Sequence, residues 1–363
     1  MVATPSQGIA RRPNTMPTSP PDVSPEAAGW PPPYLLYLGN APDELSGKTA
    51  RGLAQFRPQW CVGQFRGPDC KATIDLPVMG FDEARAAGAN TMIVGVANAG
   101  GSLDPAAVQH VVAALEAGMN VASGLHDKLA AYPPIVEAAR RNGRQLFDAR
   151  TPPPTPVGNG RKRAGRRLLT VGTDCSSGKM YTTLVLEAEM RARGITADFR
   201  ATGQTGIFVS GRGIPIDAVV ADFISGGIEW LSPARDDNGW DLIEGQGSLF
   251  HPSFAGVSMG LLHGAQPDAL VLCDEPGRPH MRGLPHFAMP SLRDTLDANL
   301  AHARLTNPAV LAVGVALNTA RLDDDEAVRI CRRVEDELGL PAQDPVRHGV
   351  GRIIDRLKAC FPD

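Results

Sequence analysis

The segment from Leu168 to Met180 constrains the fold of this chain more than any other. It consists of an apolar run, a loop bounded by Gly172 and Gly178, and Lys179, after which a helical pattern continues to Arg193. A helix N-terminus offers unpaired N–H groups and the positive end of the helix dipole, and glycines let the backbone approach an anion closely. We therefore predict a strand, a phosphate-binding loop and a helix, with Lys179 reaching the terminal phosphates as a point charge. The alternative is a glycine-rich turn with a structural role only.

The loop departs from the common phosphate-binding pattern at two points. Five residues separate Gly172 from Gly178, where G-x4-G-K-[ST] has four, and Met180 stands where a Ser or Thr hydroxyl normally binds Mg²⁺. Thr182 and Thr183 follow closely and are candidates to replace that hydroxyl. The predicted cofactor-binding residues are Gly172, Thr173, Asp174, Cys175, Ser176, Ser177, Gly178, Lys179, Met180 and Thr182, with Asn318 at the end of a later strand; alternatively, Asn318 forms a turn with Thr319.

A second motif extends from Trp240 to Pro252, where a short apolar strand ends in Glu244 and small residues follow. The carboxyl end of a parallel strand places this carboxylate beside the phosphate loop, where it can hold Mg²⁺ or accept a proton. The structural alternative is a Glu that caps the next helix. Histidine side chains can exchange protons at physiological pH, so His251 is a second candidate base, although a lone His before Pro252 also fits a structural role.

The chain alternates short β-rich runs with helical patterns, which is typical of parallel βαβ units. No G-x-G-x-x-G motif follows the first strand, at 34–38, and this disfavours dinucleotide binding. The basic residues between 161 and 167 are predicted to form a solvated linker edge. We predict an α/β protein with a disordered Pro-rich extension over 1–33, a Rossmann-like domain over 34–150, a Pro- and Arg-rich linker over 151–167, and a P-loop parallel-sheet domain over 168–363.

Within these domains we predict individual elements. The predicted strands are 34–38, 91–96, 120–123 and 145–148 in the first domain, and 168–171, 195–200, 241–243, 269–273 and 310–317 in the second. The predicted helices are 105–117, 134–141, 179–193, 325–338 and 350–359. Ser46 to Thr49 contains a second Gly-Lys-Thr string, but no apolar strand directly precedes it. We therefore predict that it starts a helix at the surface and binds no phosphate.

Charge and cysteine content exclude several classes of protein. The 36 basic and 39 acidic residues give a net charge of −3, so no overall attraction to nucleic acid or to an anionic membrane is expected. There is no run of about 18 apolar residues and no secretory h-region. The six cysteines form no C-x-x-C pair, which favours a reducing cytoplasm.

The two motifs carry a resemblance. Residues 172–179 with 243–247 resemble the phosphate loop and acidic motif of dethiobiotin synthetase and of MinD-like P-loop proteins. From about Tyr34 to Cys360, the chain more closely resembles the DgcN-type D-glutamate N-acetyltransferase family, a Rossmann-like domain followed by such a P-loop domain. Further matching segments are 124–127, 148–150, 200–206, 217 with 222–223, 244–252 and 263–268.

This resemblance implies transfer of the acetyl group of acetyl-CoA to the amine of an acidic amino acid, D-glutamate in the characterised family, as a step of D-amino-acid metabolism. The pyrophosphate and the 3′-phosphate of acetyl-CoA suit the predicted phosphate loop. The alternative is a ligase or kinase of dethiobiotin-synthetase type, in which Lys179 and Glu244 gather Mg-ATP and a substrate carboxylate is phosphorylated. A third, non-enzymatic possibility is a nucleotide-responsive assembly protein. MinD-like proteins often dimerise, so a homo-oligomer is expected.

Acetyl transfer requires a base, which we assign to Glu244 or His251, with Lys179 counted as catalytic. An acidic substrate requires cations. Arg200 is the first choice because a guanidinium pairs bidentately with a carboxylate, and Arg282 is the second, although a surface salt bridge explains it equally well. Further candidates to donate hydrogen bonds to the substrate or the thioester oxyanion are Gln204, Thr205 and Ser248.

Overall fold

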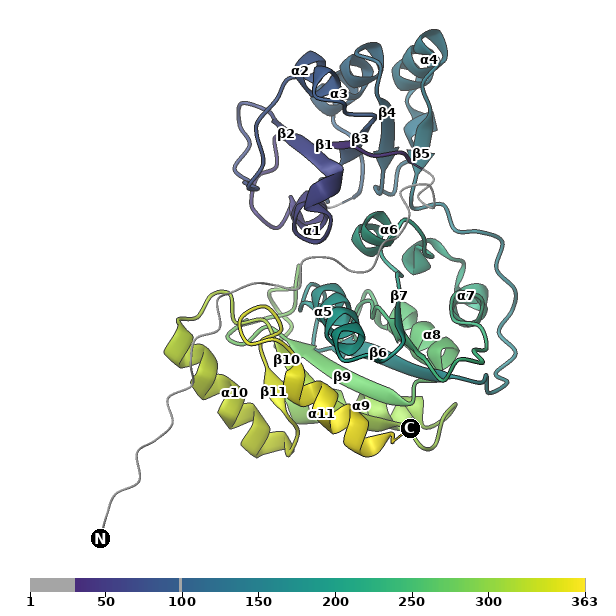
Figure 1. Ribbon diagram of the computed structural model, residues 1–363, viewed down its shortest axis with the longest axis vertical. Coiled ribbons are helices and arrows are strands. Elements are labelled where there is room, and N and C mark those ends of the chain that lie inside the picture. Colours follow the sequence, from purple (N-terminus) through teal and green to yellow (C-terminus); the bar gives the residue numbers. More distant parts are fainter. Residues whose placement is uncertain (1–29, 98–99, 363) are drawn as a thin grey trace.

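The computed structural model describes residues 30–97 and 100–362 (Figure 1). Residues 1–29 of the predicted extension lie outside this part of the chain. Trp30, near the end of the predicted extension, is buried. The centroid of its ring lies 5.1 Å from the ring centroid of Phe208 and 6.4 Å from that of Phe147. The segment at Trp30 therefore belongs to the folded core.

The N-terminal domain contains a five-stranded parallel sheet with the strand order β2-β1-β3-β4-β5. Its strands are β1 (Tyr34–Gly39), β2 (Cys61–Arg66), β3 (Thr91–Val94), β4 (Asn120–Ser123) and β5 (Leu146–Asp148), and its helices are α1 (Lys48–Phe56), α2 (Phe81–Ala86), α3 (Pro105–Glu116) and α4 (Pro133–Asn142). The predicted Rossmann-like fold is confirmed. Strand β2 and helix α2 were not predicted; β2 has intermediate burial at four of its six residues and shows little apolar run in the sequence.

The C-terminal domain contains a six-stranded parallel sheet with the order β11-β10-β9-β6-β8-β7. The strands are β6 (Arg166–Gly172), β7 (Ala197–Arg200), β8 (Trp240–Ile243), β9 (Ala269–Asp274), β10 (Leu311–Leu317) and β11 (Ala342–Gln343). The helices are α5 (Lys179–Ala192), α6 (Gln204–Ser210), α7 (Ile224–Leu231), α8 (Ala255–Ala265), α9 (Leu292–Ala303), α10 (Asp324–Leu338) and α11 (Gly351–Cys360). The predicted P-loop domain is confirmed. No helix in the described ranges has the length and apolar character that a membrane span requires.

Strand β6 lies between β8 and β9, and the chain extends the sheet on both sides of it. At such a switch point the two connections leave the carboxyl edge in opposite directions, and the loops there leave room for a ligand. The loop after β6, Glu244 after β8, and Asp274 at the end of β9 therefore meet at one place.

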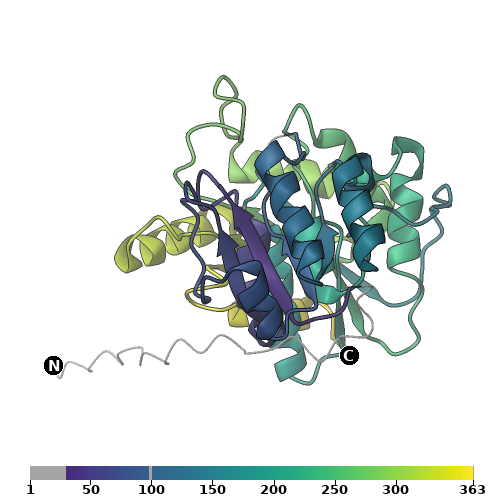
Figure 2. The same ribbon diagram turned by 90° about the horizontal axis from the view of Figure 1, so that it is seen from above.

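One hydrophobic cluster spans the two domains. Buried residues of α1 and β1, including Leu36 and Leu53, belong to the same hydrophobic cluster as Leu184 of α5 and Phe208 of α6. Helices α1 and α6 lie between the two sheets (Figure 1), and from above the N-terminal domain is seen stacked over the P-loop domain (Figure 2). The Thr49 hydroxyl lies 3.0 Å from that of Thr205. The domains are thus joined by packing as well as by the linker.

The basic run before β6 is largely structural, which corrects the predicted solvated edge. Arg167 is fully buried, and its guanidinium donates hydrogen bonds to the Ser232 hydroxyl and to backbone carbonyls, including that of Pro233. Arg166 donates to the carbonyl of Phe361. Only the start of the run, at Arg161 and Lys162, is exposed. The buried guanidinium therefore fixes the polypeptide at the amino edge of the sheet.

Candidate active site

The loop between β6 and α5 forms an anion cradle. Gly178 precedes the helix with φ of 96°, in the left-handed region that suits glycine, and no side chain caps α5. A Cβ at Gly172 would lie 2.6 Å from the Ser177 hydroxyl and 3.0 Å from Lys179 Nζ, so the loop closes tightly around the lysine. The first intrahelical bond is donated by the Thr182 amide. The amides at the start of a helix have no intrahelical acceptor, which is why helix N-termini bind phosphate.

Lys179 is buried inside this cradle. Its ammonium donates to the Asp174 carbonyl at 2.7 Å and to the Ser177 hydroxyl at 3.3 Å. Burial lowers the pKa of Lys179. Thr173 donates its hydroxyl to Asp274 at 2.6 Å, which ties the loop to β9. Asn318 lies close to Gly178, because a Cβ added at Gly178 would be 3.8 Å from the Cβ of Asn318.

Two arginines from the segment after β9 hold the loop. Arg278 pairs with the Asp174 carboxylate at 2.6 Å and donates to the Cys175 carbonyl at 2.8 Å. Arg282 donates its backbone amide to Asp174 at 2.8 Å and its guanidinium to the Ser176 hydroxyl. The structure therefore brings Arg282 to the site, as predicted, but Arg278 was missed. Its place four residues beyond the end of β9 was the signal available in the sequence.

Glu244 lies at the centre of the candidate site. Its Oε2 accepts hydrogen bonds from the backbone amides of Thr202 at 3.0 Å and Gly203 at 3.2 Å, and its Oε1 accepts one from Gln246 at 3.1 Å. Burial raises the pKa of Glu244 to about 7, partly offset by these donors and by Lys179. A carboxylate with such a pKa exchanges a proton readily near neutral pH. Because three donors already hold it, the geometry favours proton transfer over the predicted Mg²⁺ role.

His251 is buried near the loop, but both of its ring nitrogens are engaged. Nε2 lies 3.1 Å from the Arg282 carbonyl oxygen, and Nδ1 accepts a hydrogen bond from the Ser253 amide at 3.2 Å. Ser248 donates its hydroxyl to the Thr173 carbonyl at 2.9 Å. These two predicted site residues therefore position the loop and Arg282, and neither presents a free proton acceptor or donor to a substrate.

The predicted replacements for the Mg²⁺-binding hydroxyl point elsewhere. Thr183 donates to the Lys179 carbonyl at 2.7 Å, and the Thr182 hydroxyl lies 3.6 Å from the Cys273 sulfur, beneath the loop. The Met180 side chain packs at the domain interface, where a Cβ at Gly52 of α1 would lie 3.5 Å from its terminal methyl group. The position that normally binds the metal thus serves contact between the domains.

The structure does not bring Arg200 to the site. Its guanidinium donates two hydrogen bonds to the fully buried Asp241, at 2.8 and 3.0 Å. Arg235 and Ser232 bind the same carboxylate. The prediction that Arg200 holds the substrate is therefore corrected, because the side chain neutralises a buried acid on the neighbouring strand.

Gln204 and Thr205 start α6 and face the N-terminal domain. The Gln204 amide, with its nitrogen toward Gly124, donates to that carbonyl at 2.6 Å and accepts from Arg150. Arg150 also pairs with Asp217. Gln204 and Thr205, which were predicted to donate hydrogen bonds to the substrate, therefore link the two domains beside Glu244.

Three side chains at the loop have the spacing of metal ligands. Asp174, Cys175 and His251 offer ligand atoms within 4.8 Å of one another. The Asp174 carboxylate is already paired with Arg278, and burial raises the pKa of the Cys175 thiol, so this cluster is poorly suited to a cation.

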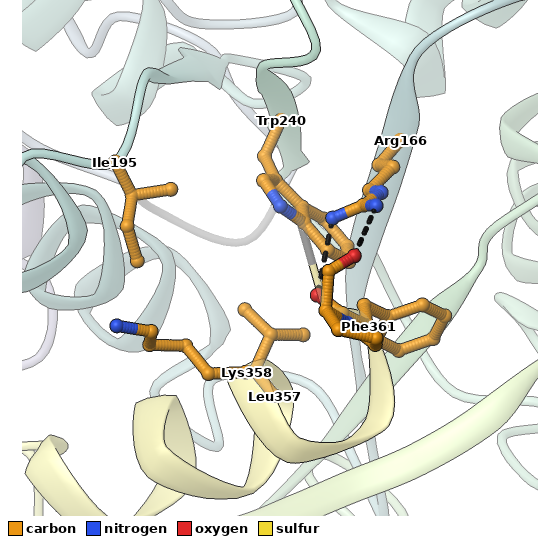
Figure 3. Close-up of a pocket in the computed structure, with 7 residues that line it drawn as sticks. Arg166, Ile195, Trp240, Leu357, Lys358 and Phe361 are labelled. Carbon is orange, nitrogen blue, oxygen red and sulfur yellow. Dashed lines mark hydrogen bonds between the residues drawn. The ribbon is translucent and has the colours of Figure 1, made fainter.

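A cavity of about 250 Å³ lies between β6, β8 and α11 (Figure 3). It is lined by Arg166 and Trp240, the first residues of their strands, and hence lies at the sheet edge opposite the loop.

Comparisons with known proteins agree with this architecture. Residues 156–354 match the model of a P-loop domain of unknown function, DUF1611_C, and residues 66–152 match the Rossmann-like DUF1611_N. The chain is 52% identical over 328 residues to a D-glutamate N-acetyltransferase of Tritonibacter scottomollicae and 49% identical over 327 residues to one of a Pseudoalteromonas species. Each match covers 90% of this chain and 98% of the relative.

A solved structure shows the same arrangement of domains. The crystal structure of a DUF1611 family protein from Anabaena variabilis matches with a TM-score of 0.83 and 31% sequence identity, covering 90% of this chain and 99% of the other. Both domains are thus matched in one relative of similar length. The chain belongs to the DUF1611 family.

Proposed function

We propose that this protein is an N-acetyltransferase that moves the acetyl group of acetyl-CoA to the amine of an acidic amino acid, D-glutamate in the first instance. The observation that carries the proposal is the buried Glu244 carboxylate, with its pKa raised to about 7, beside an anion-binding loop. The identity of about 50% to proteins named D-glutamate N-acetyltransferase supports this choice of reaction and substrate.

In this proposal the loop amides and Lys179 bind phosphate groups of acetyl-CoA. Glu244, held by the Thr202 and Gly203 amides, accepts a proton from the substrate amine. The amine nitrogen forms a bond to the thioester carbonyl carbon, the C–S bond breaks, and CoA leaves as the thiolate, which then takes up a proton. The products are the N-acetyl amino acid and free CoA.

The ligase or kinase alternative requires Mg-ATP. The structure weighs against it at one specific position, because Met180 packs against α1 where a metal-binding hydroxyl is needed, and Thr182 and Thr183 point beneath the loop. Acetyl transfer requires neither this hydroxyl nor a metal ion. The same positions therefore favour the transferase.

The experiment offers acetyl-CoA and Mg-ATP separately, each with a panel of D- and L-amino acids, and measures free CoA and ADP. We expect CoA release that depends on D-glutamate and persists in EDTA. ADP formation with a carboxylate substrate, abolished by EDTA, would select the ligase or kinase instead. Turnover of neither cosubstrate would overturn both enzymatic functions.

We further propose a reducing compartment, the cytoplasm, for this reaction. All six cysteines are free thiols, and Cys175 lies within the loop itself. Oxidation of that residue would place a bulkier polar group in the cradle. A homo-oligomer stays a prediction, to be checked by light scattering.

A further inference from the structure

The Gly-Lys-Thr string at 47–49 starts helix α1, as predicted, but not at the protein surface. Thr49 and Ala50 are fully buried, and the Thr49 hydroxyl contacts that of Thr205 at 3.0 Å. A Cβ at Gly52, one turn further, would lie 2.6 Å from the Thr205 side chain. The first turn of α1 therefore lies against α6, which begins beside the Glu244 carboxylate.

Lys48, the first residue of this helix, is half-buried at the domain interface. In the described part of the chain its ammonium makes no hydrogen bond or ion pair. The charged and titratable groups that act on it include Arg282, Cys175, Arg150 and Glu244. Burial and Arg282 lower the pKa of Lys48 to about 8, so the side chain still carries its charge at neutral pH.

The two arginines near Lys48 differ in whether an acid neutralises them. Arg282 donates its guanidinium to the Ser176 hydroxyl and makes no ion pair among the described residues, whereas Arg150 is paired with Asp217. Asp174, which accepts the Arg282 backbone amide, is already paired with Arg278, and Glu244, which acts on Lys48, shares its proton near neutral pH. Two partly desolvated cations without a counter-ion are costly, and an anionic ligand offsets that cost.

We propose that Lys48 and Arg282, one from each domain, together bind a carboxylate of the amino-acid substrate. The proposal rests on the proposed function and assigns a role to the N-terminal domain. The loop amides and Lys179 supply the phosphate site, whereas Lys48 belongs to the first turn of α1, which packs on the start of α6 beside Glu244. In the proposed function Glu244 is where the amine releases its proton. An amino acid carries its α-carboxylate one carbon from that amine, so a carboxylate at Lys48 is compatible with an amine at Glu244.

The test compares Lys48→Met and Lys48→Arg in the full-length protein with Lys71→Met, a matched change at an exposed lysine of the same domain. Thermal unfolding first checks that each variant is folded. We expect Lys48→Met to raise KM for D-glutamate at least about tenfold while KM for acetyl-CoA stays within about twofold, Lys48→Arg to recover part of the affinity, and Lys71→Met to match the wild type.

D-Glutamine identifies which carboxylate is bound. An equal rise in KM for D-glutamate and D-glutamine assigns Lys48 to the α-carboxylate, and a rise for D-glutamate alone assigns it to the side chain. Unchanged KM for D-glutamate in Lys48→Met overturns the proposal, as does an equal rise in KM for acetyl-CoA, which would assign Lys48 to phosphate.

A binding measurement separates this proposal from the proposed function. Glutarate, a dicarboxylate without an amine, is titrated calorimetrically into the wild type and into the three variants. Glutarate binding that is weakest in Lys48→Met, intermediate in Lys48→Arg and unchanged in Lys71→Met supports the carboxylate site. If the wild type then shows no acetyl transfer, that result overturns the proposed function only. Equal glutarate affinity in all four proteins, with turnover intact, overturns the role of Lys48 only.

Discussion

His251 Nε2 lies 3.1 Å from the backbone carbonyl oxygen of Arg282, while His251 Nδ1 accepts the Ser253 amide. A ring that donates through one nitrogen and accepts through the other is neutral and has no lone pair left for a substrate proton. This relationship separates the two candidate bases and leaves the role to Glu244.

Replacing Glu244 by Gln is expected to lower kcat by about 10²- to 10⁴-fold, the usual contribution of a general base. The amide keeps the shape of the carboxylate, so affinity for acetyl-CoA stays unchanged. Steady-state rates and calorimetric titration of acetyl-CoA measure the two effects. Wild-type turnover in this variant would remove Glu244 from the chemistry.

The pH dependence of kcat/KM is expected to follow the same carboxylate. Because the pKa of Glu244 is raised to about 7, the group is protonated and inactive below that value, and kcat/KM rises with pH through about 7. His251→Gln is expected to keep this rise while raising KM for the amino acid, since it acts through Arg282. A pH profile that loses its rise in His251→Gln would make His251 the base.

Folding stability is expected to fall as the pH rises, whereas kcat/KM rises. The pKa of Glu244 in the folded protein exceeds the ordinary glutamate value of about 4.5, so the contribution of this group to stability is fully present below about 4.5 and is lost as the pH rises through about 7. Relative to Glu244→Gln, the wild type should lose up to about 3 kcal/mol between pH 4.5 and 8. Urea unfolding across this range measures the difference, and a constant difference would contradict the raised pKa.

Lys179→Met is expected to weaken acetyl-CoA binding by about 10- to 150-fold, because a charge-assisted hydrogen bond is worth about 1.5–3 kcal/mol. Methionine fills much of the same buried volume, so the unfolding temperature should change little. Calorimetry with acetyl-CoA provides the measurement. Equal affinity in the variant would mean that the loop is a structural turn.

Arg200 and Arg282 are expected to respond differently to the same change. Arg200→Gln should lower the free energy of unfolding by roughly 1–3 kcal/mol, because Asp241 keeps Arg235 and Ser232, and should leave KM unchanged. Arg282→Gln should raise KM for the acidic substrate with a smaller loss of stability. Denaturant unfolding and initial rates distinguish the two, and the reverse pattern would restore Arg200 to the substrate site.

The sequence predicted the elements that depend on local signals. The strands β1, β4, β6 and β8 and the helices α5 and α10 all lie close to their predicted ranges. Strands buried on both faces leave apolar runs in the sequence, and α10 buries a single stripe that leaves a direct helical pattern. The phosphate loop was found in the same way, since its glycines, Lys179 and the following helix are consecutive. Glu244 was found because it directly follows a strand.

Tertiary structure decided which charges are available. Arg200 and Arg282 have the same chemistry, yet one is paired with the buried Asp241 and the other reaches Ser176 of the loop. Lys48 is distant from the loop in sequence and was predicted to lie at the surface, but packing of α1 on α6 brings it to the interface. Short-range patterns were enough to predict both parallel sheets apart from their edge strands β2 and β11, together with the cradle and its acid. Only long-range packing determined which cations face that acid, because pairing depends on neighbours far apart along the chain.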